Sequence, residues 1–386
     1  MSKLDSFKDD DSHSALGISL LNWVSVLFLV YFLLCAVGLL ESGFRLLYAD
    51  EARSLIAAAT HPVMGVCVGI LATALVQSSS VTTSILVGFV AGGLPLHIAI
   101  PIVMGANVGT TVTNSVVALG FAPDREELRR AFSAASVHDC FNLLCLAIFL
   151  PLELAFGLFQ NMAATLSTLM PPADIVNHDL SQTYNFISSA TAPFITEISN
   201  GVAHLPTPGA GIAQVGIGLG LIVFCIHFVK KLLRALLVGS SKRIAETALH
   251  SGPASGIASG FVATLITQSS STTTSLVVPL VGSGALTTRQ IYPFTLGANI
   301  GTCITAILAA FAVTGARNTA FELAFIHLFY NVLGVLIVFA VPFLRYLPVS
   351  MAETLAQATD GKRLWIVVYL LVIFLMLPAL GLVILG

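Results

Sequence analysis

The chain carries the stretch Gln77-Ser78-Ser79-Ser80-Val81-Thr82-Thr83-Ser84 between two short apolar runs. Residues 268–275 repeat it 191 positions later as Gln-Ser-Ser-Ser-Thr-Thr-Thr-Ser. A block of hydroxyls and amides is costly in lipid, because each polar group there loses several kcal/mol unless protein, water or a ligand satisfies it. The doubled block therefore predicts a ligand site near the middle of a membrane, built from two halves.

Composition assigns the chain to the membrane. Of its 386 residues, 56% are hydrophobic and 9% are charged, whereas soluble domains carry about 25% charged residues. We therefore expect an all-α polytopic membrane protein in a lipid bilayer. The formal net charge of −2, without a basic tract, gives no support for a nucleic-acid partner. The six cysteines form no CxxC pair, so we expect buried free thiols and neither disulfides nor a zinc site.

Each polar block is flanked by apolar runs too short to cross a bilayer. About 15 apolar residues precede the first block, and about 13 follow it before Gly92-Gly93-Leu94-Pro95. A crossing helix needs about 20 residues, because each residue adds about 1.5 Å. Two half-length helices joined by a polar turn predict a re-entrant hairpin that enters the membrane and returns on the same side. One interrupted span is the alternative.

A second motif, Gly-Ala-Asn-(Val/Ile)-Gly-Thr, occupies residues 105–110 and 297–302. Each copy lies near the centre of an apolar run of span length, about 96–119 and about 291–313. Two glycines and an asparagine at the midpoint of a span predict a broken helix with exposed backbone groups. Close helix packing through small residues is the alternative.

The two halves of the chain are copies of one plan. Residues 65–84 and 256–275 share eleven identities in twenty positions, and a later span repeats with His138 matched by His327. Three full crossings separate corresponding points. Since an odd number of crossings turns the second copy over, we expect inverted repeats whose hairpins enter from opposite sides. This is the geometry of a carrier that works by alternating access.

Charges in the connecting segments predict the orientation. Five basic residues fall within 230–243 and three arginines within 124–130, whereas 171–208 holds neither Lys nor Arg. The positive-inside rule puts the first two segments in the cytoplasm and the third outside. We expect seven full crossings, the first of them (about 18–40) a retained signal anchor.

The predicted organisation has five parts. They are a cytoplasmic N-terminal tail (1–17), a first repeat (18–170), an extracytoplasmic linker loop (171–208), a second, inverted repeat (209–346) and a C-terminal segment with the final span (347–386).

Few charges accompany the polar blocks. Residues 62–123 contain no Asp, Glu, Lys or Arg, and Arg289 is the only one between 247 and 316. Hydroxyls, amide oxygens and freed carbonyls suit Na⁺, while the N-terminal ends of half-helices suit an anion. A neutral cage in low dielectric holds both ions better than either alone, since each neutralises the other. The residues therefore predict Na⁺-coupled transport of a small oxyanion.

The doubled Gln-Ser-Ser-Ser block, the paired Gly-Ala-Asn motif and the run from Arg129 to Asn142 resemble the type II sodium-dependent inorganic phosphate cotransporter family. The resemblance covers roughly residues 55–158 and 252–335. It implies Na⁺-driven uptake of inorganic phosphate, with Na⁺ as the coupling ion and no organic cofactor, and it leaves a homodimer open. The short termini and the cysteine-free central loop differ from animal members, and the chain is similar to a bacterial member of the inner (plasma) membrane.

The resemblance assigns phosphate to the serines of both blocks and to an arginine beside the substrate path, a residue suited to bidentate contact. These phosphate candidates are Ser78, Ser79, Ser80, Ser269, Ser270, Ser271 and Arg125. Two structural alternatives remain. The serine hydroxyls could bond to helix carbonyls, and Arg125 could anchor the cytoplasmic side.

The resemblance assigns Na⁺ to amide, hydroxyl and carboxyl oxygens. These sodium candidates are Gln77, Gln268, Ser269, Thr110, Thr302, Thr305, Asn107, Asn299, Asp139 and Asn142, with Asp124 as a helper at a further cation site. Asp139 matches an acidic position that goes with charge-carrying transport, and Leu328 replaces it in the second copy. Packing against His138 or Asn142 is the alternative role for Asp139, and the two histidines are expected to bridge helices.

Three classes of alternative to such a carrier make different predictions. Within membrane transport, the alternatives are a Na⁺-coupled carrier for another oxyanion such as sulfate, and an anion channel. An intramembrane serine hydrolase would need a motif such as G-x-S-x-G, H-E-x-x-H or G-x-x-x-x-G-K, and the sequence has none of them. A structural scaffold would tolerate Ser→Ala in both blocks. We therefore expect a carrier and no enzyme.

Overall fold

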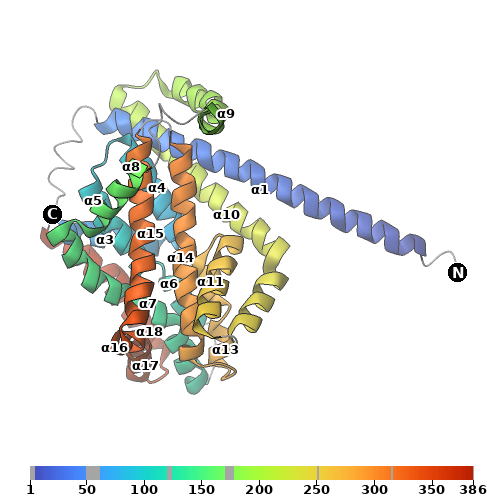
Figure 1. Ribbon diagram of the computed structural model, residues 1–386, viewed down its shortest axis with the longest axis vertical. Helices are drawn as coiled ribbons and strands as arrows, with labels where there is room; N and C mark the ends of the chain where they lie inside the picture. Colours follow the sequence, from blue (N-terminus) through green and yellow to red (C-terminus); the bar gives the residue numbers. More distant parts are fainter. Residues whose placement is uncertain are drawn as a thin grey trace.

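The computed structural model describes residues 5–48, 61–119, 124–169, 178–249, 252–313 and 316–385, and every regular element within these ranges is helical (Figure 1). The all-α prediction is therefore confirmed. Seven described segments are long and apolar enough to cross a membrane, in agreement with the seven predicted crossings. They are Leu21–Phe44, Leu96–Leu119, Arg125–Phe156, Pro208–Cys225, Thr288–Ala312, Arg317–Ala340 and Arg363–Leu385. The chain is a multi-pass membrane protein.

The helices follow one another without intervening sheet. The first half contains α1 (Asp5–Tyr48), α3 (Pro62–Val76), α4 (Ser79–Gly92), α5 (Leu96–Gly109), α6 (Val112–Leu119), α7 (Arg125–Phe156), α8 (Leu158–Leu169) and α9 (His178–Val202). The second half contains α10 (Thr207–Leu249), α11 (Pro253–Thr267), α12 (Ser270–Ser275), α13 (Val278–Gly282), α14 (Thr288–Ala312) and α15 (Arg317–Ala340). The C-terminal part contains α16 (Pro342–Arg345), α17 (Leu347–Ala358), α18 (Arg363–Leu371), a π-helical turn (Val372–Met376) and α19 (Leu377–Leu385).

Each polar block forms the turn of a helix–turn–helix. In the first copy, Pro62 begins α3, where its missing N–H is not needed. That helix ends at Val76 and is capped by Gln77, and α4 begins at Ser79. In the second copy, α11 and α12 meet in the same way at Gln268, but the returning helix divides into α12 and α13 before Pro279. Pro279 has no backbone N–H to donate to Ser275, the residue four positions earlier at which α12 ends, and this accounts for the division.

The Gly-Ala-Asn motif breaks a helix in the first copy alone. There, α5 ends at Gly109 and α6 begins at Val112, with the hydroxyls of Thr110 and Thr111 bonded back to carbonyls at 3.0 and 2.9 Å. Such bonds compete with the helical ladder. The prediction of a broken helix in the second copy is wrong, because α14 runs continuously through residues 297–302. Cys303 stands where the first copy has Thr111. Its thiol lies 3.9 Å from the carbonyl oxygen of Asn299 in the same helix and 3.5 Å from that of His327, and a thiol is too weak a donor to compete with the helical ladder.

Small residues in both motifs serve close packing. A Cβ added at Gly105 would meet the carbonyl oxygen of Val66, and one added at Gly297 would meet that of Ile257. Helices α3 and α5, and helices α11 and α14, therefore approach until their backbones touch. This packing role explains why α14 can keep two glycines without breaking.

The linker loop predicted over 171–208 is also wrong in part, because α9 covers most of it and α10 begins at Thr207. The polar composition of this segment obscured the helical spacing of its apolar residues. In the part of α9 whose side chains are described, Thr191, Phe194, Ile198 and Val202 face inward at helical spacing. Phe194 packs edge-to-face on Phe32 of α1, with ring centroids 5.2 Å apart. The predicted N-terminal tail likewise differs, since α1 already begins at Asp5.

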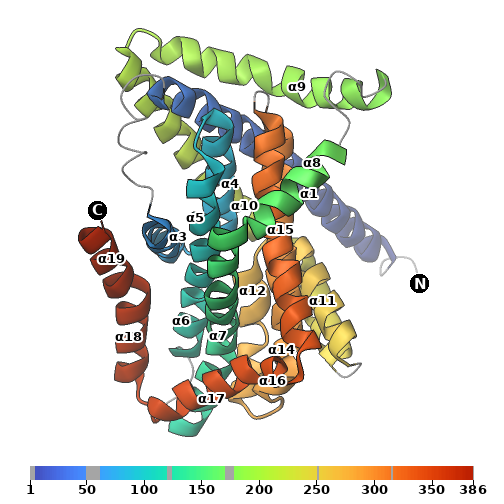
Figure 2. The same ribbon diagram turned by 60° about the vertical axis from the view of Figure 1, so that its left-hand side comes forward.

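The two helix–turn–helix units extend toward opposite ends of the molecule. Figure 2 shows α4 and α5 reaching the end where α9 lies, while α17 lies at the other end. Near that other end, Arg130 of α7 donates from Nε to the carbonyl oxygen of Gly282 in α13, at 3.0 Å. The two segments that carry the Gly-Ala-Asn motif form the centre, since 67% of each span is buried compared with 17% of the final span. All six cysteines are buried free thiols, as predicted.

Candidate functional site

The two turns have the same backbone conformation. Gln77 has φ 58° and ψ 30°, and Gln268 has φ 51° and ψ 29°, both left-handed. The following serines are extended, with φ −159° at Ser78 and −157° at Ser269. A left-handed non-glycine residue costs about 1–3 kcal/mol and is typical of functional sites. The same strain at two equivalent positions indicates a constraint shared by both copies.

The turn serines are buried, with exposures between 2% and 7%. Ser78 and Ser269 are helix caps, whose hydroxyl oxygens accept from the N–H of Val81 at 3.4 Å and of Thr272 at 3.2 Å. Ser271 donates to the carbonyl oxygen of Thr110 at 3.3 Å. Of the six turn serines, Ser79, Ser80 and Ser270 have hydroxyls that form no hydrogen bond with the described residues. These three are therefore free to bind a ligand.

Helix α6 joins the two turns. Thr113 donates from Oγ1 to the side-chain oxygen of Gln77 at 3.2 Å. The next residue, Asn114, donates from Nδ2 to Oγ1 of Thr274 at 2.8 Å, and the same hydroxyl lies 3.0 Å from Oδ1 of Asn114. The break in the first Gly-Ala-Asn helix thus lies between the two polar blocks. Sequence reasoning missed Thr113 and Asn114, although a polar pair directly after a predicted helix break was a usable signal.

A buried network of amides and imidazoles crosses between the repeats. His138 Nε2 lies 2.9 Å from Oδ1 of Asn299, and His327 Nε2 lies 3.1 Å from Oδ1 of Asn107. Each histidine thus pairs with the asparagine of the other copy, and both bridge helices as predicted.

Asn142 and Asn331 complete this network. The Asn299 amide donates to the side-chain oxygens of Asn142 at 2.9 Å and Asn331 at 2.7 Å, and Asn142 donates to the carbonyl oxygen of Asn107 at 2.8 Å. Three sodium candidates, Asn107, Asn299 and Asn142, are therefore brought together, bonded to one another and almost fully buried.

The other neutral sodium candidates lie on the helices around this network. The hydroxyls of Thr110, Thr302 and Thr305 donate to carbonyl oxygens of their own helices, at 3.0, 3.2 and 2.8 Å. Their remaining lone pairs stay open to a cation. Gln77 is exposed, whereas Gln268 is half-buried and donates to the carbonyl oxygen of Leu265 at 2.7 Å.

Asp139 is fully buried on α7. One carboxylate oxygen, Oδ2, accepts from the hydroxyl of Tyr369 at 3.2 Å, and Oδ1 has no hydrogen-bond partner among the described residues. Among the described residues, Asp139 forms no hydrogen bond with His138 or Asn142. Tyr369, from the final span, was missed because the sequence gives no signal for its contact with α7.

The structure does not bring Arg125 to the turns. Arg125 is exposed in the first turn of α7 and lines a cavity of about 490 Å³ with Lys362 and Arg363. It lies about 21 Å along α7 from Asp139, at 1.5 Å per residue. Asp124 caps the same helix by accepting from the N–H of Glu126 at 2.7 Å.

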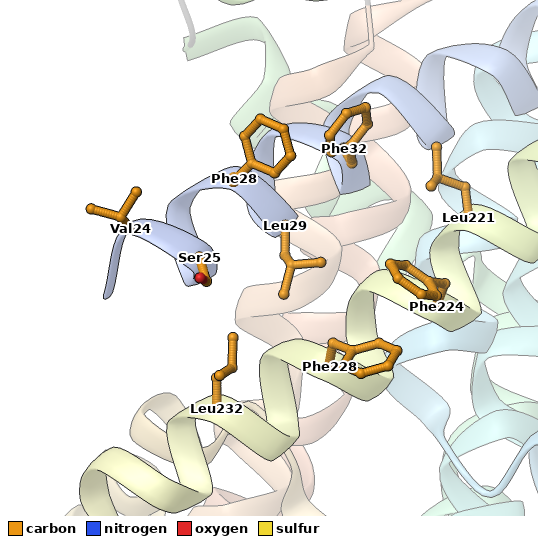
Figure 3. A pocket seen from close by; sticks show the side chains of 9 residues that line it. All are labelled: Val24, Ser25, Phe28, Leu29, Phe32, Leu221, Phe224, Phe228 and Leu232. Carbon is orange, nitrogen blue, oxygen red and sulfur yellow. The ribbon is translucent and has the colours of Figure 1, made fainter. Parts of the chain in front are cut away.

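A cavity of about 710 Å³ between α1 and α10 is too apolar for a phosphate site (Figure 3). Its one polar side chain, Ser25, donates to the carbonyl oxygen of Leu21 at 2.8 Å, within α1. The nine lining residues are Val24, Ser25, Phe28, Leu29, Phe32, Leu221, Phe224, Phe228 and Leu232.

Comparison with known proteins agrees with this arrangement. The family model described as Na+/Pi-cotransporter matches residues 32–167 and 208–347, which together are more than half of the chain and include one polar block each. The chain belongs to this family. The resemblance inferred from the motifs is therefore confirmed, and the two matched segments of this cotransporter-family protein correspond to its two copies.

Curated relatives carry matching names. Sodium-dependent phosphate transport protein 2A of Ovis aries is 33% identical over 94% of this chain and 68% of its own length. The 2A protein of Mus musculus is 34% identical over the same shares. Sodium-dependent phosphate transport protein 2B of Homo sapiens is 30% identical over 90% of this chain and 63% of its own length. No solved structure matches this cotransporter-family chain.

Proposed function

We propose that this protein couples Na⁺ influx to the uptake of inorganic phosphate as a secondary active carrier. Membership of the family and the names of its relatives support the substrate and the coupling ion. The observation that carries the proposal is the pair of strained Gln-Ser turns with one backbone conformation, joined through α6. The relatives are transport proteins, which argues against the serine hydrolase.

Phosphate is assigned to the turn serines. The unbonded hydroxyls of Ser79, Ser80 and Ser270 can donate to phosphate oxygens. The first N–H groups of α4 lie at the positive end of its helix dipole, which favours an anion there. Caps at Ser78 and Ser269 hold this geometry. Arg125 stands apart from this cluster, and we assign it to the cytoplasmic surface.

Sodium is assigned to the oxygens around the Gly-Ala-Asn motifs, together with Gln268 and Asp139. The donors are almost all neutral, and the exception is Asp139, a fully buried carboxylate next to His138 of the buried network. Phosphate and Na⁺ then balance each other's charge in a low dielectric, which gives a physical reason for coupling.

Alternating access is assigned to two inverted repeats. The extension of the two helix–turn–helix units toward opposite ends of the molecule supports this inversion (Figure 2). In this proposal the first hairpin enters from outside, the second enters from the cytoplasm of a bacterial inner membrane, and residues 171–208 lie outside.

The test is uptake of labelled phosphate by proteoliposomes under imposed gradients. We expect accumulation with an inward Na⁺ gradient, none with K⁺, and a voltage dependence that Asp139→Asn weakens. Labelled sulfate in place of phosphate tests the other-oxyanion alternative. Phosphate flux that equilibrates without Na⁺ and never concentrates would instead identify an anion channel.

A further inference from the structure

The buried carboxylate of Asp139 lacks a basic partner. No salt bridge to it forms within the described residues, and its Oδ1 atom is fully buried without a hydrogen bond. A carboxylate in such surroundings is strongly disfavoured unless a positive charge compensates it. Oδ1 is therefore the atom to which a cation would bind. The other oxygen, Oδ2, accepts the hydrogen bond that holds the carboxylate in place.

The group that holds it is the Tyr369 hydroxyl, 3.2 Å from Oδ2. The tyrosine ring is itself fixed by edge-to-face contacts with Phe132 and Phe374, whose centroids lie 5.8 and 5.9 Å away. A hydroxyl on a ring held from two sides can orient a carboxylate, because neither partner is free to rotate away.

The helix that carries Tyr369, α18, ends two residues later, at Leu371. Residues Val372–Met376 form a π-helical turn, and this turn supplies Phe374. Wide turns of this kind inside α-helices are rare and are frequent at functional sites, since they shift the side chains that follow onto another face. Here the turn itself carries one of the two rings that hold Tyr369.

The final span contacts the first repeat on the side of its polar turn. Helix α18 contacts α6, and the π-helical turn and α19 contact α3 (Figure 2). Helix α3 is capped by Gln77 at its C-terminal end, and α6 carries the residues that bond to both polar blocks. The second copy has Leu328 in place of Asp139. The acid that Tyr369 contacts thus occurs in the first repeat and has no counterpart in the second.

We propose that Tyr369 is a positioning residue of the sodium site, holding Oδ2 of Asp139 so that Oδ1 faces the cation. The final span, which belongs to neither repeat, then completes that site. This inference rests on the proposed function for the identity of the cation, and on geometry for the role of the tyrosine.

The test is Tyr369→Phe, which keeps the ring and its packing. Its matched control is Tyr330→Phe, since Tyr330 is also buried between two rings, Phe149 and Phe159, and its hydroxyl has no partner. One readout is the Na⁺ concentration that half-activates uptake by proteoliposomes. The other is the shift in thermal unfolding produced by Na⁺ alone in detergent.

We expect Tyr369→Phe to raise the half-activating Na⁺ concentration about tenfold, the effect of losing one hydrogen bond to a charged group. The Na⁺-induced thermal shift should fall with it, while the KM for phosphate at saturating Na⁺ stays within about twofold. Tyr330→Phe should leave all three unchanged. In an Asp139→Asn background, Tyr369→Phe should add nothing further, because the two residues act as one unit.

Two results would overturn the role of Tyr369. One is a Na⁺-induced thermal shift equal to wild type in Tyr369→Phe, and the other is an effect that adds fully to that of Asp139→Asn. Failure of the proposed function looks different, since wild type would then take up no phosphate in response to Na⁺. In that case the shift in thermal unfolding produced by Na⁺ without phosphate can still be compared between wild type, Tyr369→Phe and Tyr330→Phe.

Discussion

The two copies share their turns and differ in what surrounds them. Gln77 and Gln268 have nearly the same left-handed backbone, and a capping serine follows each. The helices that follow each turn differ, because each copy has one interrupted helix and it is not the same one. The first copy has a continuous returning helix and a broken Gly-Ala-Asn helix, whereas the second has a divided returning helix and an unbroken Gly-Ala-Asn helix.

This difference separates what both halves must keep from what each can change. In the proposed function the turns hold the same ligand from two sides, and this accounts for a geometry that both copies keep in spite of its strain. The surrounding helices can specialise. The first copy alone carries Asp139 and the α6 residues that bond to both polar blocks. In the proposed function, ion coupling is therefore concentrated on this copy.

The largest expected effect comes from the free serines of the turns. Ser79→Ala and Ser270→Ala occupy equivalent positions, and each should raise the KM for phosphate roughly 10- to 100-fold through the loss of a charge-assisted hydrogen bond. Ser25→Ala, in the apolar cavity of α1, is the control and should have no effect. Kinetics of labelled phosphate uptake measure this. A large effect in one copy and none in the other would break the equivalence of the turns.

Close packing should be equally strict in both copies. Gly69→Ala and Gly260→Ala would bring a Cβ against the carbonyl oxygens of Ile102 and Phe294, and we expect each to lower stability by about 3 kcal/mol. Thermal unfolding in detergent measures the loss. Gly220→Ala is the control, because nothing lies within 4 Å of its Cβ, and it should be neutral or slightly stabilising. Tolerance at Gly69 or Gly260 would contradict the backbone contact.

Replacing Gln77 or Gln268 by glycine distinguishes the effect of backbone strain on stability from the effect of the glutamine side chain on ligand binding. Gln77→Gly and Gln268→Gly should each raise the free energy of unfolding by about 1 kcal/mol, because glycine adopts the left-handed conformation without strain. Only Gln268→Gly should also weaken Na⁺ activation, since Gln268 is half-buried and Gln77 is exposed. Equal losses of Na⁺ activation would show that the first copy contributes its glutamine after all.

The smallest effect is expected at Arg125, which lies outside both turns. Arg125→Ala should change the KM for phosphate by less than about twofold, since the side chain is exposed and faces Lys362 and Arg363. Uptake kinetics at low ionic strength are the most sensitive measurement. A loss as large as that of the serine variants would return Arg125 to the phosphate path.

Much of this fold could be predicted, because apolar run length and internal repetition are direct physical signals. The crossings, the polar turns and the correspondence of positions between the two copies follow from these signals. The unbroken α14 could not be predicted, since the same glycines serve either a break or close packing, and Thr111 against Cys303 decides between them. Helix α9 was hidden by polar composition. The contact between Tyr369 and Asp139 joins residues 230 positions apart and leaves no local pattern.

The central claim is that both turns bind one phosphate, and only together with Na⁺. Protection of a cysteine from a thiol reagent tests it most directly, using Ser79→Cys and Ser270→Cys in a background without the six native cysteines. Both positions should be protected by phosphate with the same half-saturating concentration, and only when Na⁺ is present. Protection of one position alone, or protection that is independent of Na⁺, would contradict the account.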